Sequence, residues 1–364
     1  MVMLFGVVLL FIAIALLPSV IHLIIICIGM IVRFDRGRVD FSNLGTITVV
    51  IPTRDEEVVI QSKLENVEMI FSHLSQVSIV IYDCSKDETP NIVQRFIDRR
   101  RLSKNWKIVT GCQVGKSNTV LRAIREVKSD LMIMTDADSV VGTEDVNELL
   151  RELSREGVSA ACGRNAGDKS LYRRISNWVR FSESNIGATV VFEGSICGFK
   201  MCELNEDSID VNRNADDSQL AVSAQKKGKK AVFLRSCNFN DLDEVVDSRE
   251  RKIRRAQGLI KHLGKEVKDS ENSFLIRLLS GLNLHFYVIM PVSLFAIFAL
   301  CTSLSTGLLD IPSLESLNSP VLNIIAGVLL ISVAGGASCV YSAIFRMMAG
   351  RNLSVWQPMR ESVD

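Results

Sequence analysis

A short apolar run that ends in polar residues, ITVVIPTRDE, occupies Ile47–Glu56. Three similar runs follow it along the chain: VSIVIYD at Val77–Asp83, WKIVTG at Trp106–Gly111 and DLMIMTD at Asp130–Asp136. Each run is short, rich in β-branched or long aliphatic residues and bounded by polar residues, which is typical of strands buried on both faces. Apolar residues recur at helical spacing in the segments between them, Glu57–Leu74, Thr89–Arg101 and Ser117–Val127. This alternation predicts an α/β fold with a doubly wound, mostly parallel sheet.

Acidic residues cluster where three of these strands end. The clusters are PTRDE at Pro52–Glu56, DCSKD at Asp83–Asp87 and DAD at Asp136–Asp138. In open parallel sheets ligands bind at the carboxyl ends of the strands, so these clusters are candidate ligand contacts. Two carboxylates separated by one small residue can share a magnesium or manganese ion that keeps positions open for phosphate oxygens. The alternative is that each aspartate only caps the helix that follows it.

Six motifs in order strengthen the functional interpretation: PTRDEE, YDCSKDET, VGKSNTVLRAI, MTDADS, ADDSQL and RKIRRAQG. Together they resemble the membrane-bound family 2 glycosyltransferases of the GT-A fold, which include ceramide glucosyltransferase, cellulose synthase and hyaluronan synthase. The resemblance covers about Ile47–Gly258. It implies an enzyme that transfers a sugar, with inversion, from a UDP- or GDP-sugar donor.

The resemblance also implies a role for each matching residue. Contacts with the nucleotide sugar are expected at Pro52, Thr53, Glu56, Asp83, Lys116, Asp136, Arg251, Arg254 and Arg255. Asp136 and Asp138 match the metal-binding DxD triplet, with Asp138 expected to be the more direct ligand of Mg²⁺ or Mn²⁺. Asp217 matches the general base, which takes the proton of the acceptor hydroxyl while cations stabilise the departing diphosphate. Alternatively, Asp216 and Asp217 form an acidic first turn favoured by the helix dipole.

Several positions bear on the acceptor. Arg251 and Arg255 replace the glutamine and tryptophan of the processive relatives, in which that tryptophan helps to hold the acceptor sugar, so we expect transfer of a single sugar. The segment Glu193–Lys200 resembles the acceptor-side segment of the family, although an ordinary turn is the favoured structure for it. Trp178 and Phe181 could line the acceptor side, but packing in the core is favoured.

Apolar segments flank this charged body. Val2–Val32 contains no Asp, Glu, Lys or Arg, and Leu278–Leu300 and Val321–Phe345 are also long enough to cross a membrane. The arginines next to these segments all fall on one side, which the positive-inside rule makes the cytoplasm. The predicted domains are a transmembrane helix at 1–32, a cytoplasmic GT-A domain at 33–248, a basic amphipathic interface helix at 249–277, two transmembrane helices at 278–348 and a cytoplasmic tail at 349–364.

Composition narrows the class of partner. The 42 Lys plus Arg nearly balance the 41 Asp plus Glu, which argues against a nucleic-acid protein held by bulk charge. In the interface helix, apolar residues from Ile253 to Val267 recur at helical spacing among basic ones, a pattern suited to an anionic membrane surface.

The sequence therefore predicts a multi-pass integral membrane glycosyltransferase whose partners are a nucleotide sugar, a membrane lipid acceptor and the bilayer. Three alternatives remain open. They are a polyprenyl-phosphate sugar synthase, a processive polysaccharide synthase and a non-catalytic membrane-anchored subunit that binds a partner protein.

Overall fold

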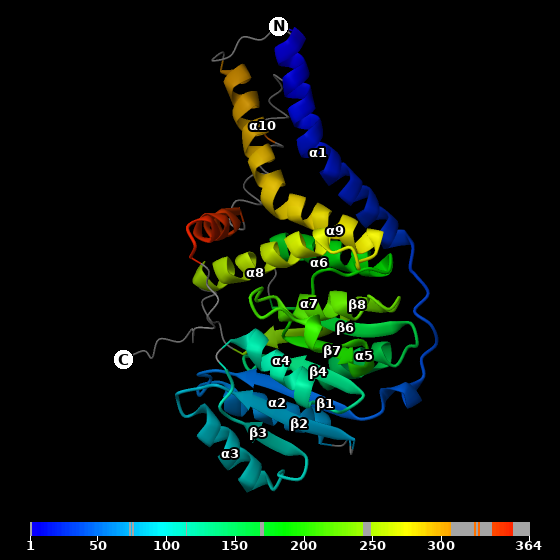
Figure 1. Cartoon of the computed structure of the whole chain (residues 1–364), viewed down its shortest axis with the longest axis vertical. Helices are drawn as coiled ribbons and strands as arrows, with labels where there is room; N and C mark the ends of the chain where they lie inside the picture. The colour runs from blue at the N-terminus through cyan, green and yellow to red at the C-terminus, as the bar shows by residue number, and fades with distance from the viewer. Residues whose placement is uncertain are drawn as a thin grey trace.

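The computed structural model describes residues 2–306 except 73, 75, 114, 168–170 and 243–248, together with residues 324, 327 and 337–351. An eight-stranded sheet with helices on its faces forms one end of the molecule (Figure 1). Two helices, α1 (Val2–Ile31) and α10 (Met290–Ser305), project side by side from the other end. Between the two parts lies a band of three helices, α6 (Leu171–Asn185), α8 (Arg249–Lys268) and α9 (Phe274–Leu284).

The first half of the sheet follows the predicted alternation. Its strands are β1 (Ile47–Thr53), β2 (Val77–Asp83), β3 (Trp106–Val109) and β4 (Leu131–Thr135), and the helices between them are α2 (Ile60–Phe71), α3 (Thr89–Arg100) and α4 (Lys116–Glu126). These strands lie in the order β3-β2-β1-β4 and are all parallel. Every residue of β1 and β4 is buried, as expected for strands covered on both faces.

The second half adds antiparallel pairs to the mostly parallel sheet that was expected: in the described residues four of the seven strand pairs are parallel and three are antiparallel. Strand β7 (Ile196–Lys200) runs antiparallel to both β4 and β6 (Val158–Asn165), and β8 (Lys230–Asp241) pairs with β6 in parallel and with β5 (Ser139–Val141) in antiparallel. The expectation of an ordinary turn at Glu193–Lys200 was wrong for its second half, because Ile196–Lys200 is the strand that joins the two halves. Helices α5 (Thr143–Leu153) and α7 (Asp216–Ser223) complete this part.

Alternate residues of the strands feed two cores on opposite faces of the sheet. Val49 and Ile79 belong to the core on the side of α2, α3 and α5, whereas Val50 and Val80 belong to the core that includes residues of α4 and α7. This is the two-residue period of a strand, in which neighbouring side chains point to opposite faces. The sheet is therefore held from both sides, and its strand ends form a fixed platform.

The predicted span Leu278–Leu300 is divided by a bend. Helix α9 ends at Leu284, a π-helical turn follows at His285–Ile289, and only then does α10 begin. The apolar residues of α9, such as Leu279, pack with Val190 and Leu263 of the domain, so α9 belongs to the band of helices. Of the predicted span, only α10 continues beside the projecting part of α1 (Figure 1). Among the described residues, Phe274–Ala299 is the one helical run long and apolar enough to cross a membrane, and a shorter apolar helix covers Leu16–Ile31. The predicted span Val321–Phe345 lies largely outside the described residues.

Helix α1 is fixed to α6 by close packing and hydrogen bonds. A Cβ at Gly29 would lie 2.1 Å from the backbone oxygen of Ser182, so the two backbones approach as only glycine permits. The side-chain amide of Asn185 donates to the backbone oxygen of Gly29 (2.8 Å). The backbone oxygen of Asn185 accepts the Phe34 amide (2.8 Å). Because of these contacts, α1 forms one unit with the domain.

Helix α8 uses its apolar face within the protein. Ile253 packs against Cys339 and Ala343 of the helix at residues 337–348, and Leu263 belongs to the core that includes α9. Part of the apolar face that was interpreted as a membrane-docking surface is thus covered by other helices of the same chain. The basic residues of α8 remain on its other faces, and its first turns reach the carboxyl ends of the strands.

Candidate active site

The loops after β1 and β2 are locked together through Asp83. Its side chain is 2% exposed, and its carboxylate accepts the hydroxyls of Thr53 (2.7 Å) and Ser85 (2.6 Å) and the Ser85 amide (3.2 Å). Pro52 lies in the buried part of β1, next to Thr53. Asp83, expected to contact the donor, therefore also fixes the shape of the loop that would receive it.

A second set of hydrogen bonds continues this interlock. Ser85 accepts the Asp55 amide (2.8 Å), and the Asp55 carboxylate accepts the Lys86 amide (2.7 Å), while Asp55 adopts a left-handed backbone with φ of 53°. The Glu56 amide donates to the hydroxyl of Thr89 at the start of α3 (2.9 Å). Sequence reasoning did not single out Ser85 or Thr89, although both belong to the motif YDCSKDET that carried the resemblance.

Lys116, the first residue of α4, connects two acidic motifs that lie far apart in the sequence. Its Nζ is 2.7 Å from Oδ1 of Asp136 and 3.7 Å from Oδ2 of Asp216. Ser117 donates its hydroxyl to the other oxygen of Asp216 (3.0 Å). Burial opposes the charge of Lys116, but the carboxylates of Asp136, Asp216 and Asp217 together raise its pKa far above the ordinary value. The lysine is therefore a permanent cation at the centre of the site.

Asp217 stands beside this cation in the first turn of α7. Burial and the adjacent Asp216 carboxylate raise the pKa of Asp217 to about 7. Its Oδ1 accepts the Ser218 amide (2.7 Å). A Cβ at Gly194 would lie 3.1 Å from both Oδ2 of Asp217 and Nζ of Lys116, so the glycine keeps this side of the carboxylate clear. A carboxylate with a pKa near neutrality is suited to general base catalysis.

The Asp136–Asp138 turn follows β4, with both carboxylates partly open to solvent. The Ser195 hydroxyl lies 3.3 Å from Oδ2 of Asp136, and Nη1 of Arg251 lies 3.7 Å from Oδ2 of Asp138. Nearby, burial and the charge of Asp138 raise the pKa of Asp241, a residue that sequence reasoning missed.

This pair has the oxygen chemistry that Mg²⁺ and Mn²⁺ prefer, but it is small. Among the described residues there is no cluster of three or more His, Cys, Asp or Glu side chains that could hold a metal ion. Two carboxylates would therefore bind a divalent ion mainly together with phosphate oxygens of a ligand and water. The donor set fits such a metal, in company with a diphosphate.

Arginines from α8 approach the same edge. Burial, together with the neighbouring charges of Arg255 and Arg251, lowers the pKa of Arg254 to about 10. This crowding of like charges is offset by Asp136 and Asp216, which favour the charged form of Arg254. The three arginines predicted to bind the donor are thus brought together, and Arg255 is exposed.

Glu193 forms a neighbouring ion cluster that sequence reasoning did not assign. Arg173 (2.6 Å) and Arg180, both from α6, hold its carboxylate. Burial works against its charge, but the two arginines lower the pKa of Glu193 to about 2. Because Gly194 follows directly, this cluster fixes the turn that faces Asp217.

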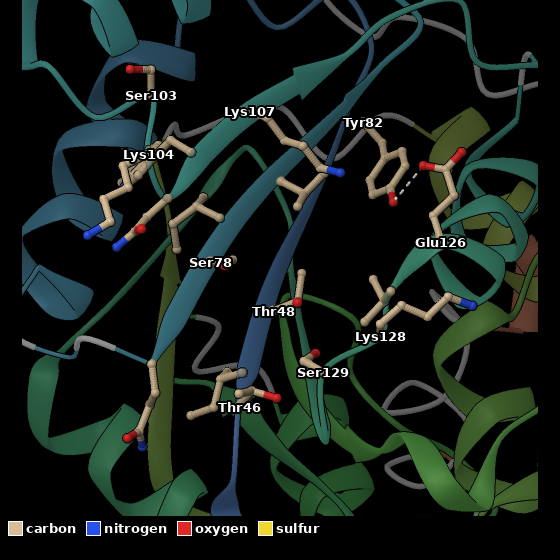
Figure 2. Close-up of a pocket in the computed structure, with 17 residues that line it drawn as sticks. Thr46, Thr48, Ser78, Tyr82, Ser103, Lys104, Lys107, Glu126, Lys128 and Ser129 are labelled. Carbon is tan, nitrogen blue, oxygen red and sulfur yellow. Dashed lines mark hydrogen bonds between the residues drawn. The ribbon is translucent and has the colours of Figure 1, made fainter.

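A groove of about 590 Å³ lies at the other end of the strands (Figure 2). Its lining includes the first residues of β1 and β2, such as Thr48 and Ser78, with Lys104 and Lys107 around β3. Tyr82 closes one side by donating its hydroxyl to Glu126 (3.2 Å). The lining of this groove includes none of the residues predicted to bind the donor or the metal. The candidate site is therefore the carboxylate cluster at the carboxyl ends of the strands.

Comparisons with known proteins give a family match for part of the chain and a fold match for most of it. Residues 48–193 match the family model described as Glycosyl transferase family 2. The solved structure of the mannosyltransferase PcManGT from Pyrobaculum calidifontis, in complex with GDP-Man and Mn²⁺, is 19% identical and has a TM-score of 0.73 over 94% of this chain and 99% of that chain. No curated protein matches the chain.

Two further solved structures are less similar. Glucosyl-3-phosphoglycerate synthase from Mycobacterium tuberculosis, in complex with Mg²⁺ and UDP, is 15% identical with a TM-score of 0.44 over 64% of this chain and 85% of that chain. S. aureus TarS 1–349, in complex with UDP-GlcNAc, is 13% identical with a TM-score of 0.46 over 84% of this chain and 92% of that chain.

The matched region runs from β1 through the Asp136–Asp138 turn to Glu193, and the likeness to the mannosyltransferase extends over nearly the whole chain. The chain is therefore a glycosyltransferase: residues 48–193 match the family 2 glycosyltransferase model, and the mixed sheet is GT-A-like.

Proposed function

We propose that this enzyme transfers a single sugar from a nucleoside-diphosphate sugar to a membrane lipid, with inversion at the anomeric carbon and with Mg²⁺ or Mn²⁺ as cofactor. One observation carries the proposal. Lys116 holds the first carboxylate of the Asp136–Asp138 turn and lies beside the Asp216–Asp217 pair, so the predicted donor side and the predicted base share one cation. Such a cluster would place a base and a leaving-group site on either side of one lysine.

In the proposed reaction, Asp217 removes the proton from the acceptor hydroxyl as its oxygen attacks the anomeric carbon. The sugar–phosphate bond breaks on the opposite side, and the nucleoside diphosphate leaves. Lys116, Arg251 and Arg254 stabilise the charge that develops on the diphosphate, because preorganised cations act strongly in a site shielded from water. Asp136 and Asp138 would hold the metal ion, which would supply Lewis-acid stabilisation of the leaving group.

The donor and cofactor assignments have independent support. The Pyrobaculum mannosyltransferase, whose fold this chain shares, was solved with GDP-Man and Mn²⁺. A GDP-sugar is therefore the first donor to test, with UDP-sugars next.

The lipid acceptor is inferred from the surfaces that surround the site. Helix α1 exposes the large apolar side chains of Leu17, Leu23 and Ile31, and α10 exposes that of Phe295. Exposed apolar surface of this extent is typical of contact with lipid. Trp178 of α6 was expected in the core but is 52% exposed, and tryptophan is favoured at membrane–water interfaces.

Helix α6 connects this surface to the site. It packs against α1 at Ser182, and it carries Arg173 and Arg180, which hold Glu193 next to the turn that faces Asp217. An acceptor lipid that enters along α1 and α6 would thus bring its head group close to the base. The cytoplasmic orientation of the domain, the three-span topology and the absence of a nucleic-acid partner remain parts of this proposal.

The test supplies membranes that contain the protein with radiolabelled GDP-mannose, UDP-glucose and UDP-N-acetylglucosamine in turn, with and without Mn²⁺, and partitions the products. Metal-dependent label in the organic phase supports the proposal and identifies the donor. Label in insoluble, high-molecular-weight material indicates a processive polysaccharide synthase. Label in a lipid that mild acid cleaves indicates a polyprenyl-phosphate sugar synthase, because glycosyl phosphates are acid-labile. Membranes with the Asp217→Asn variant give the background, and no incorporation above that background from any donor contradicts the proposal.

A further inference from the structure

A lysine lies fully buried beneath the Asp136–Asp138 turn. Lys63 is on α2, is 0% exposed and shares the buried face of that helix with Ile60 and Leu64. Burying an ammonium group is costly unless hydrogen bonds compensate it. The position of Lys63 therefore calls for a specific role.

The two hydrogen bonds of Lys63 bracket the turn. Its Nζ donates to the hydroxyl of Thr135 (2.6 Å) and to the backbone oxygen of Ser139 (2.7 Å). Thr135 is the last residue of β4, and Ser139 is the first residue of β5. One amine thus ties together the two ends of the three-residue segment that carries both predicted metal ligands.

The same network reaches the turn on the acceptor side. The Thr135 hydroxyl donates to the backbone oxygen of Ser195 (2.8 Å), and the Ser139 hydroxyl lies within reach of the backbone oxygens of Asp136 (3.1 Å) and Ser195 (3.2 Å). Because Ser195 also reaches the Asp136 carboxylate, Lys63 anchors a set of contacts that joins the two turns.

The charge of Lys63 is finely balanced in this place. Burial lowers the pKa of Lys63 to about 7, while the carboxylates of Asp136 and Asp138 act in the opposite direction. The amine can donate both hydrogen bonds in either protonation state. Its contribution to the turn therefore does not depend on its titration.

We propose that Lys63 is a positioning residue that holds the Asp136–Asp138 turn in the geometry in which its carboxylates accept a divalent cation together with the donor diphosphate. The inference rests on the proposed metal role of Asp136 and Asp138. Lys63 acts through Thr135 and Ser139 and touches neither the metal nor the substrate.

The test measures Mn²⁺ binding directly, by the electron paramagnetic resonance signal of free Mn²⁺ during titration of the full chain in detergent with GDP, and separately with UDP. Lys63→Met keeps the length and apolar volume of the side chain but removes both hydrogen bonds. Loss of a partner that orients metal ligands typically weakens metal binding about 10-fold to 100-fold, and we expect a loss in this range. Lys230→Met is the matched control, because Lys230 is half-buried at the start of β8, away from the candidate site.

The sign of the change separates positioning from charge. If Lys63 acted only as a cation under two carboxylates, its removal would tighten Mn²⁺ binding, so unchanged or tighter binding in Lys63→Met overturns the inference. The conservative pair Thr135→Ser and Thr135→Val approaches the same network from its other end. The serine keeps the hydroxyl and should bind Mn²⁺ like the wild type, whereas the valine should not, and equal binding by the pair also overturns the inference.

The wild-type titration keeps the two proposals distinguishable. Uptake of Mn²⁺ by the wild type but not by Lys63→Met supports both proposals. Failure of the wild type to bind Mn²⁺ with either nucleotide refutes the metal role of the turn, and the inference about Lys63 falls with it. Thermal unfolding and near-ultraviolet circular dichroism of each variant establish that the compared proteins are folded.

Discussion

The role of Asp217 is the prediction on which the proposed mechanism most depends. Asp217→Asn keeps the size of the side chain and leaves an oxygen to accept the Ser218 amide, but it removes the proton acceptor. General base catalysis typically contributes a factor of about 10² to 10⁴, so kcat should fall by that amount. Nucleotide-sugar and Mn²⁺ binding should be retained, because the substitution leaves Lys116 and Asp136 in place.

The structure also gives the sign and size of an effect on stability. The pKa of Asp217 rises from 3.8 to about 7, which at about 1.4 kcal/mol per pKa unit corresponds to an upper bound of about 4 kcal/mol. Because the side chain is only half-buried, solvent screening reduces this to about 1–2 kcal/mol. The folded state binds more protons than the unfolded state between these two pKa values, so the free energy of unfolding falls as pH rises from about 4 to 7. Asp217→Asn lacks this loss and should be about 1–2 kcal/mol more stable than the wild type above pH 7.

Two assays check these expectations. The pH profile of kcat/KM reports groups in the free enzyme, and for the wild type it should show an acid limb of unit slope with a midpoint near pH 7, since Asp217 must be ionised. The residual activity of Asp217→Asn should lack this limb. Chemical denaturation at pH 5 and pH 8 measures the stability difference, which should be larger at pH 8. Asp207→Asn, an exposed aspartate in the segment before α7, is the matched control and should resemble the wild type in both assays.

Retention of more than about a tenth of the wild-type kcat by Asp217→Asn would be incompatible with a general base at this position. An unchanged acid limb in the variant would likewise assign the limb to another group. A variant less stable than the wild type at pH 8 would show that ionisation of Asp217 does not destabilise the folded state. The argument from burial and the Asp216 charge would then fail.

Three further predictions follow from single contacts. Lys116→Met should raise KM for the donor at least 10-fold and lower kcat, because it removes the cation between Asp136 and Asp216. Steady-state kinetics at saturating Mn²⁺ will measure both constants. Unchanged KM and kcat would contradict the central role of this lysine. Gly29→Leu should lower the midpoint of thermal unfolding in detergent, because its Cβ would lie 2.1 Å from the Ser182 oxygen. A midpoint equal to that of the wild type would exclude the close packing of α1 on α6. Trp178→Ala should reduce transfer to lipid in membranes several-fold while hydrolysis of the donor is unchanged, and equal loss of both activities would argue against an interfacial role for its exposed ring.

Much of the fold was predictable because its signals are local. The runs that begin at Ile47, Val77 and Trp106 contain enough apolar residues to identify buried strands, and the structure begins β1, β2 and β3 at these residues. The helices between them were predictable from apolar spacing alone. Strand β7 was not, because Ile196–Lys200 is short, contains a glycine and becomes a strand only through its pairing with β4 and β6.

The bend between α9 and α10 has a similar explanation. The apolar stretch from Leu278 looks continuous in the sequence, because lipid and a protein core favour the same side chains. Only the packing of Leu279 against the domain shows that the first part of the stretch serves the core. Likewise, the apolar residues of α8 fit a membrane surface equally well, and the structure covers Ile253 with Cys339 and Ala343.

The sequence by itself determined the parallel half of the sheet, the acidic turn after β4 and the kind of chemistry that such turns support, since these depend on neighbours along the chain. The tertiary structure decided which charges meet. It alone placed Lys116 between Asp136 and Asp216, closed two arginines of α6 around Glu193 and set Lys63 under the Asp136–Asp138 turn. A lysine in a helix sequence carries no sign of burial, because the free energy of its charge depends on the dielectric surroundings and hydrogen-bond partners that distant segments supply.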